Sequence, residues 1–295
     1  MTVAFVFAGQ GVEPPWIAPD LVARADAAAL IDAASAATGC DVRHLLVRGG
    51  AALARTEVMQ PALVTACLIA ARALGAAGLA PDVVCGHSLG ELAAWAAGGY
   101  VAPVDAIAVA AVRGRLMARE AARSPGGMAI AGGDVARALA VGQAHGRLVV
   151  AAENSPAETA VAGDEAALAA IARALGCRRL PVAGAWHSGA MSDAVGELRA
   201  ALAAVPRASG PHAPLVCNRD GAVAAADALP ERFAGQLVQP VRWIACARAL
   251  AARGVTRYVA VGPGRLVRGL LRANLGDIDV RIVETERDVA RAVAP

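Results

Sequence analysis

The residues best suited to chemistry in this chain are one serine and a small set of histidines and arginines. The serine, Ser88, lies in "VVCGHSLGELAAWAAG", where an apolar run typical of a strand meets a run typical of a helix. A serine on such a sharp turn exposes its hydroxyl, and amides at the helix N-terminus can stabilise a negative oxygen on a bound carbonyl. The pattern predicts a nucleophile at Ser88, with the N–H of Leu89 as one oxyanion donor. The alternative is an ordinary loop that contains a serine.

A nucleophilic serine needs a base, and the chain offers five histidines: His44, His87, His145, His187 and His212. His87 adjoins Ser88, so its side chain should point away from the nucleophile. His187, in "GAWHSGAM", lies where the chain returns from an inserted unit to its main domain, and clefts between domains commonly hold sites. We predict His187 as the base, against the alternative of a histidine without a chemical role.

Strand-like and helix-like runs alternate along the chain, which predicts an α/β fold with a parallel sheet covered on both faces. "TVAFVF" and "PDVVCG" are typical of buried strands. Residues 60–78 are typical of a helix with Pro61 near its first turn, and residues 103–123 of a long helix. The chain is expected to end in a helix that begins at Arg265.

Residues 126–184 follow another order: strand, helix, strand, strand, helix and a last strand in "CRRLPVAG". This order predicts an inserted ferredoxin-like subdomain. The expected organisation is an α/β-hydrolase-like large domain in two parts, residues 1–124 and 187–295, with the ferredoxin-like small subdomain at residues 125–186 between them.

Composition narrows the classes of function. With 295 residues, of which 57% are hydrophobic, the chain can bury a substantial core. No apolar run reaches the ~18 uncharged residues of a membrane helix, and "MTVAFVFAGQG" lacks the features of a secretory signal. A net charge of +3 and 3% aromatic residues do not support nucleic-acid binding. The cysteines form no CxxC pair, so no metal site is expected. We expect a cytoplasmic protein without membrane contact.

Several stretches, in order, resemble segments of the malonyl-CoA:acyl-carrier-protein transacylase family, whose members are discrete enzymes or acyltransferase domains of polyketide and fatty acid synthases. They are "FVFAGQG", "TEVMQPALVTACL", "GHSLGELAA", "VRGRLM", "AAENSPAETAVAG", "LPVAGAWHS", "QLVQPVRW" and "VGPGRLVRGLL". The resemblance covers nearly the whole chain. It implies that a malonyl group passes from an acyl-CoA thioester to a serine and then to the phosphopantetheine thiol of an acyl carrier protein. No cofactor beyond the substrate malonyl-CoA is implied, and we expect a monomer.

The resemblance also implies roles for individual residues. Ser88 is matched to the nucleophile and His187 to its general base and acid. The backbone amides of Gln10 and Leu89 are matched to the oxyanion hole. The main-chain carbonyl of Gln236 is matched to the group that orients the histidine, which would make a dyad without a buried acid.

Arg113 is matched to the residue that holds the carboxylate of the acyl group. A guanidinium can bind a carboxylate through two parallel hydrogen bonds, although a solvated helix face is the alternative for this arginine. Met117, one turn along, would form an apolar wall, and Gln60 and His87 would lie behind the site. Trp186 would narrow the space around the acyl α-carbon and favour malonyl over methylmalonyl, or it is simply a packed apolar residue.

Two residues depart from the family pattern: Ala8 stands where proline is usual, and Glu13 where glutamine is usual. They affect the substrate assignment more than the reaction type. Three other functions stay open. They are a thioesterase or other acyl hydrolase, for which Asp164 could supply an acid, the malonyl-transfer subunit of a malonate decarboxylase, and a catalytically silent assembly subunit.

Overall fold

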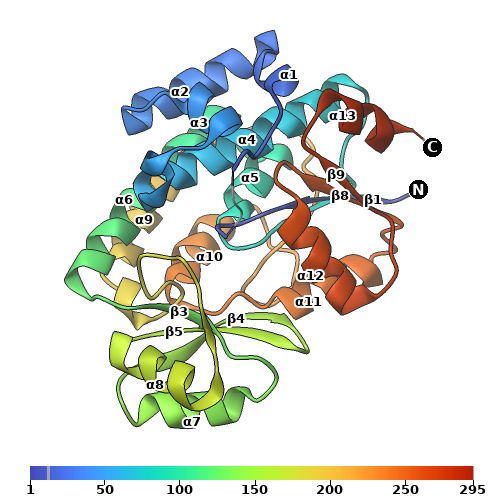
Figure 1. The fold of residues 1–295 in the computed structure, drawn as a ribbon. Coiled ribbons are helices and arrows are strands. Elements are labelled where there is room, and N and C mark those ends of the chain that lie inside the picture. Colours follow the sequence, from blue (N-terminus) through green and yellow to red (C-terminus); the bar gives the residue numbers. More distant parts are fainter. Residues whose placement is uncertain (12–13, 295) are drawn as a thin grey trace.

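Two separate sheets organise the molecule (Figure 1). The computed structural model describes residues 1–11 and 14–294. Within these residues, the larger sheet has five parallel strands in the order β7-β2-β1-β8-β9. The smaller sheet has four antiparallel strands in the order β4-β5-β3-β6. The predicted α/β class, with a parallel sheet and a distinct second sheet, is confirmed.

The central strands of the larger sheet are mostly apolar because helices cover both of their faces, and Arg257 at the start of β8 is the charged exception. Every residue of β1, β2 and β8 is buried, as expected for interior strands of a parallel sheet. The strands are β1 Val3–Phe7, β2 Val83–Gly86, β3 Gly127–Ile130, β4 Leu148–Ser155, β5 Glu158–Gly163, β6 Arg178–Arg179, β7 Leu215–Val216, β8 Arg257–Val261 and β9 Val280–Val283.

Helices surround the larger sheet and cover one face of the smaller one. They are α1 Pro19–Val22, α2 Ala28–Thr38, α3 Val42–Arg48, α4 Thr56–Ala76, α5 Gly90–Ala97, α6 Pro103–Arg123, α7 Val135–Gln143, α8 Glu165–Leu175, α9 Ala194–Ala203, α10 Leu229–Gly235, α11 Trp243–Ala252, α12 Arg265–Leu275 and α13 Glu286–Val293. Helices α4, α5 and α6 pack on one another and α5 contacts β1 and β2.

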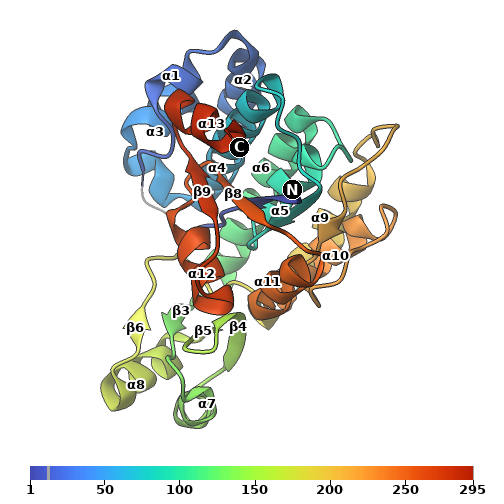
Figure 2. The same cartoon turned by 90° about the vertical axis from the view of Figure 1, so that its right-hand side faces the viewer.

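The smaller sheet lies between its own helices and the larger domain (Figures 1 and 2). Helices α7 and α8 pack together on the side away from the larger domain, whereas β4 contacts α11 and α12 of that domain. The surface where α12 meets the smaller sheet is therefore a junction between the two parts of the fold.

Several elements differ from the sequence prediction. Helix α4 begins at Thr56, so Pro61 lies inside the helix and not near its first turn. In residues 177–184 only Arg178–Arg179 pair as a strand, and Pro181 just beyond cannot donate a ladder hydrogen bond. The chain does not end in the helix that begins at Arg265, because β9 and α13 follow it. Helices α1 to α3 and α10 were not predicted either.

Helix α4 bears on the expectation that no apolar run of the chain is long enough to cross a membrane. By length and composition alone it could cross a membrane, although Arg72 lies within it. Of its most apolar window, 83% is buried inside the protein, as for the core helix of a folded domain. The predicted domain boundaries at residues 124 and 186 stay a prediction.

Candidate active site

Ser88 lies on a tight turn between β2 and α5, as the sequence pattern predicts. Its φ of 51° is in the left-handed region, which is uncommon for a residue with a side chain. Glycines on both sides permit the turn. A Cβ on Gly86 would lie 2.0 Å from the carbonyl carbon of Gly90, and one on Gly90 would lie 2.4 Å from the backbone oxygen of Phe7. The close approach of β1, β2 and α5 therefore holds the serine in this strained conformation.

His187 comes from a distant part of the chain and meets this serine. Its Nε2 lies 2.7 Å from the Oγ of Ser88, and its Nδ1 lies 2.8 Å from the backbone oxygen of Gln236. A carbonyl oxygen only accepts hydrogen bonds, so Nδ1 carries the hydrogen in the neutral ring. Nε2 is then free to accept the proton of the Ser88 hydroxyl.

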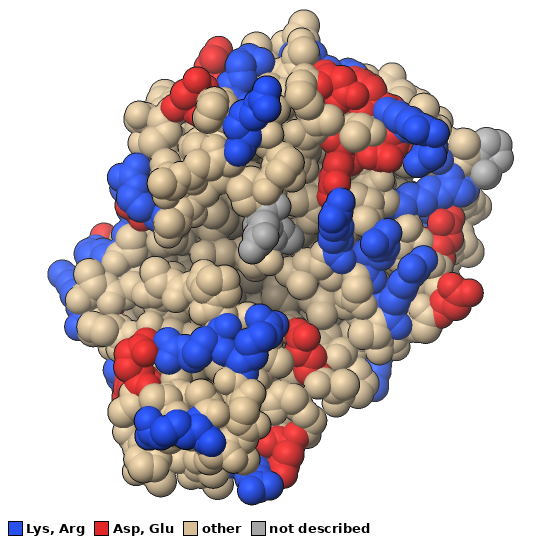
Figure 3. Space-filling model, viewed as in Figure 1, with Lys and Arg blue, Asp and Glu red and all other residues tan. Residues whose placement is uncertain are grey.

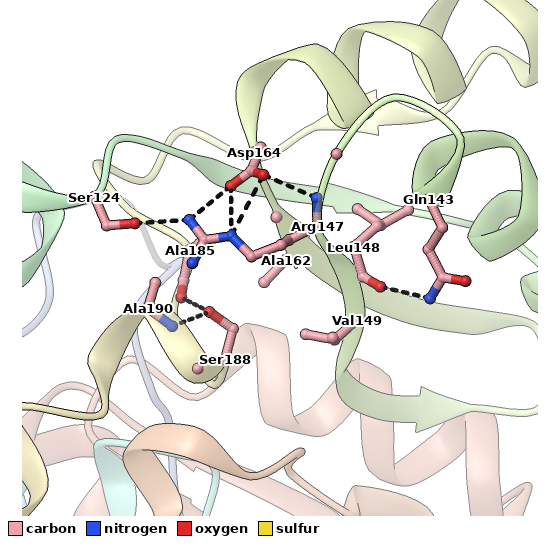
Figure 4. A pocket seen from close by; sticks show the side chains of 13 residues that line it. Ser124, Gln143, Arg147, Leu148, Val149, Ala162, Asp164, Ala185, Ser188 and Ala190 are labelled. Carbon is pink, nitrogen blue, oxygen red and sulfur yellow. Dashed lines mark hydrogen bonds and ion pairs between the residues drawn. The ribbon is translucent and has the colours of Figure 1, made fainter.

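A second serine fixes the turn that carries His187. The hydroxyl of Ser188 donates to the backbone oxygen of Ala185 at 2.7 Å and accepts from the backbone N–H of Ala190 at 3.2 Å (Figure 4). These contacts support the positive φ of His187, which is 58°. The same loop lines a cavity of about 450 Å³ on the small-subdomain side (Figure 4). Asp164, the candidate acid of a hydrolase, lines this cavity and pairs with Arg147, whereas the residues matched to the transacylase site do not line it.

Arg113 lies beside Ser88 and not on a solvated helix face. It is only 3% exposed, whereas Arg115 on the same helix is exposed, so the surface alternative is wrong. Its Nη1 donates to the Oε1 of Gln60 at 2.8 Å. Its Nη2 donates to the Oε1 of Gln236 at 3.0 Å and to the Oγ of Ser88 at 3.3 Å. The buried guanidinium is thus aimed at the hydroxyl of Ser88.

These groups line one cavity at the junction of the two parts of the fold. Its volume is about 310 Å³, and α12 contributes Leu266 and Leu270 to one wall while β3 contributes Met128 and Ile130 to another. The predicted site residues that line it are Gln10, His87, Ser88, Leu89, Arg113, Met117, Trp186 and His187. Gln60 and Gln236 do not line this cavity, and both contact Arg113 from behind.

Two backbone amides at this cavity have no acceptor within the described part of the chain, as an oxyanion hole would require. Among the hydrogen bonds of residues 1–11 and 14–294, neither the N–H of Gln10 nor that of Leu89 donates to a protein group. The N–H of Ser88 is occupied by a side chain. Of the two residues that depart from the family pattern, Ala8, just after β1, is buried, and Glu13 lies outside the described residues.

Burial sets the protonation of His187 and Arg113 in this cavity. It lowers the pKa of His187 to about 3, with a further contribution from the positive charge of Arg113. The imidazole is therefore neutral near pH 7 and able to accept a proton. Burial also lowers the pKa of Arg113 to about 10, which still leaves the guanidinium charged near neutral pH.

The remaining predicted residues surround this centre. The Nε2 of His87 lies 2.9 Å from the Oδ1 of Asn154 on β4, so this ring points toward the small sheet, as expected from its place beside Ser88. Gln60 is fully buried and its Nε2 donates to the Sδ of Met117 at 3.3 Å. Trp186 is 3% exposed and lines the cavity. Its effect on the acyl group stays a prediction.

Two residues at this centre escaped the sequence analysis. The Oδ1 of Asn218 accepts from the N–H of Ser88 at 2.6 Å, and its Nδ2 donates to the backbone oxygen of Gly86 at 2.6 Å. Glu91 is 2% exposed, and burial raises its pKa to about 8. The signals were present: Glu91 is a single carboxyl group in the apolar run "GELAAWAA", and Asn218 closes the strand-like run "APLVCN".

Comparisons with known proteins agree with this geometry. A family model described as an acyl transferase domain matches residues 4–264. The malonyl CoA-acyl carrier protein transacylase of Mycobacterium tuberculosis (strain ATCC 25618 / H37Rv) is 34% identical over 293 residues, which cover 95% of this chain and 94% of that protein.

Two solved structures share the whole fold. The crystal structure of MCAT from Mycobacterium tuberculosis has a TM-score of 0.90 at 32% identity and covers 100% of both chains. A malonyl-transacylase in complex with its type II PKS acyl-carrier protein has a TM-score of 0.90 at 26% identity and covers 99% of both chains. The family match and the similarity along nearly the full length show that this chain belongs to the acyl transferase domain family and, within it, to the malonyl CoA-acyl carrier protein transacylases.

Proposed function

We propose that this protein moves a malonyl group from coenzyme A to the phosphopantetheine thiol of an acyl carrier protein through an acyl-serine intermediate on Ser88. The observation that carries the proposal is the meeting of three groups in one buried cavity: the hydroxyl of Ser88, the neutral imidazole of His187 and the guanidinium of Arg113. Together they supply a nucleophile, a base and a fixed positive charge.

Acylation begins with proton transfer from the Ser88 hydroxyl to the Nε2 of His187, across 2.7 Å. The serine oxygen forms a bond to the thioester carbon, and the carbonyl oxygen becomes an oxyanion. The amides of Gln10 and Leu89 are the proposed donors to that oxyanion. The carbon–sulfur bond then breaks, His187 returns its proton to the sulfur, and coenzyme A leaves as the thiol.

Transfer to the carrier repeats these steps with a different thiol. His187 takes the proton of the phosphopantetheine thiol, the sulfur attacks the acyl-serine ester, and the serine oxygen leaves and is protonated. The reaction is therefore ping-pong. The hydrogen bond from Nδ1 of His187 to the backbone oxygen of Gln236 keeps the ring in the required tautomer in both halves.

The proposed role of Arg113 is to select an acyl group with a terminal carboxylate. Its position, 3.3 Å from the Oγ of Ser88, puts a positive charge within reach of a carboxylate on an acyl group bound there. Burial strengthens such a charge pair because little water screens it. Malonyl has this carboxylate, and acetyl does not.

Basic side chains around the cavity suit an anionic donor and an acidic carrier. Figure 3 shows basic residues on both sides of the central hollow. Arg265, Arg268 and Arg272 are exposed on α12, which lines the cavity, and the exposed Arg178 lines it from the small subdomain. Such a distribution attracts the phosphates of coenzyme A and an acidic carrier protein.

A product analysis separates transfer from its rivals. The protein is mixed with malonyl-CoA with and without a holo acyl carrier protein, and malonyl-carrier and free malonate are measured by mass spectrometry. We expect malonyl-carrier to form faster than malonate. Faster release of malonate in both mixtures would indicate a hydrolase. If neither product forms, a third mixture that contains the carrier of a malonate decarboxylase decides between the last two rivals: transfer there would indicate the decarboxylase subunit, and no product there would indicate a silent protein.

A further inference from the structure

Glu91 is a buried carboxyl group with no part in the mechanism above. It lies in the first turn of α5, three residues after Ser88, and is 2% exposed. A buried carboxyl group is costly unless hydrogen bonds satisfy it. Its Oε1 accepts from the backbone N–H of Asn218 at 2.7 Å, and its Oε2 accepts from the Nε2 of Gln236. Asn218 thus anchors the carboxyl group, which is aimed at the side chain of Gln236.

The chemistry of the neighbouring groups fixes how the Gln236 amide must be turned. Arg113 only donates hydrogen bonds, so the Oε1 of Gln236 has to face it, at 3.0 Å. The Nε2 therefore points to the opposite side. There it donates to the backbone oxygen of Ser88 at 3.1 Å and to Glu91. A carboxyl oxygen at Glu91 is the acceptor that makes this orientation favourable.

Gln236 in turn contacts all three reacting groups. Its side-chain oxygen holds Arg113, its side-chain nitrogen holds the backbone of Ser88, and its backbone oxygen holds the Nδ1 of His187. A residue with three such contacts transmits any displacement to the nucleophile, the base and the cation together. Its only other side-chain partner among the described residues is Glu91.

We infer that Glu91 is a positioning residue for the transfer reaction, which acts by holding the Gln236 amide in one orientation. This inference rests on the proposed function. Glu91 itself touches no reacting atom. Loss of its acceptor oxygen leaves the backbone oxygen of Ser88 as the one remaining acceptor of the Gln236 NH2 among the described residues, so the amide is held less firmly between Arg113 and the serine. A misplacement of catalytic groups by about 1 Å costs on the order of 10²-fold in rate.

The test uses Glu91→Gln, which keeps the size of the side chain but replaces one acceptor oxygen by a donor NH2. We expect kcat/KM for malonyl transfer to fall about 10²-fold. The matched control is Glu120→Gln, because Glu120 is also buried, at 3% exposed, but pairs with Arg119 and lies outside the cavity. The control should retain wild-type transfer. A wild-type rate in folded Glu91→Gln would overturn the inference.

A double-mutant cycle tests the route of the effect. Gln236→Met removes the amide but keeps the backbone oxygen that contacts His187. If Glu91 acts through this amide, Gln236→Met alone lowers kcat/KM for malonyl transfer. Adding Glu91→Gln to Gln236→Met should then lower kcat/KM by less than a further factor of about three. Independent, multiplying losses would contradict the inference, as would wild-type transfer in Gln236→Met. Should Glu91→Gln fail to fold, Glu91→Asp, which withdraws both acceptors by one methylene, takes its place.

A second readout separates this inference from the proposed function. The rate at which a fluorophosphonate labels Ser88 reports the serine and its base without any acyl substrate. We expect Glu91→Gln to slow this labelling about tenfold. If the wild-type protein transfers no malonyl group, the proposed function fails, and the labelling rates still decide the inference. If the wild type transfers malonyl and the variant matches it in both assays, only the inference fails.

Discussion

Replacement of Arg113 by methionine tests how this cavity chooses its acyl group. The guanidinium is 3% exposed and lies 3.3 Å from the Oγ of Ser88, so the carboxylate of a malonyl group, one methylene away from the acylated carbon, would take the place of that contact. Methionine fills similar space without charge. The substitution also removes the N–H donors that Arg113 gives to the Oε1 atoms of Gln60 and Gln236. That loss affects every substrate equally.

The size of the effect follows from the number of hydrogen bonds lost. Two hydrogen bonds to a charged group contribute roughly 1.5–3 kcal/mol each. Their sum is about 3–5 kcal/mol if the two bonds are not both ideally aligned. At about 1.4 kcal/mol per factor of ten, the malonyl reaction should slow by about 10²- to 4 × 10³-fold more than a reaction that makes no such bonds.

The assay compares kcat/KM for malonyl-CoA and acetyl-CoA with one holo carrier protein. Arg113→Met should lower the malonyl-to-acetyl ratio by at least about 10²-fold. Arg115→Met, an exposed position on the same helix, should leave the ratio unchanged. If Arg113→Met slows both substrates by the same factor, the arginine does not recognise the carboxylate.

Three further predictions follow from single features of the cavity. Because the pKa of His187 lies near 3, the rate constant of acylation should stay flat from about pH 8 to about pH 5, and a fall centred near pH 6.5 would contradict a neutral buried base. Trp186→Ala should raise the ratio of methylmalonyl to malonyl transfer at least about tenfold, and an unchanged ratio would show that the indole does not limit the pocket. Gly90→Ala places a Cβ 2.4 Å from the backbone oxygen of Phe7 and should lower the unfolding free energy in urea by about 1–3 kcal/mol, whereas Gly269→Ala, with no atom within 4 Å, should not destabilise.

Local patterns in the sequence predicted the elements that position the site. Alternating apolar runs indicated the parallel sheet, because its interior strands are buried on both faces. Two glycines around Ser88 indicated the sharp turn, because a Cβ at either would clash with backbone. Short or mixed elements were missed. In β9, for example, Arg281 interrupts the apolar run, and only pairing with β8 makes the segment a strand.

Contacts between distant segments could not be predicted from local patterns. The resemblance matched the carbonyl of Gln236 to a contact with His187, and the structure places it there at 2.8 Å. The side chain of the same residue also joins Arg113 to Glu91, which only the assembled fold reveals. Burial of Arg113 likewise depends on the packing of α6 against α4. The periodicity of the sequence could not distinguish this arginine from one on a solvated helix face.

The most direct test of the account is the intact mass of the protein after brief mixing with malonyl-CoA, followed by peptide mapping. We expect one malonyl group per chain, located on Ser88, in the wild type. We expect none in Ser88→Ala, and slow formation in His187→Ala. Full labelling of Ser88→Ala, or a malonyl group on another residue, would contradict the claim that Ser88 is the acylated nucleophile of this cavity.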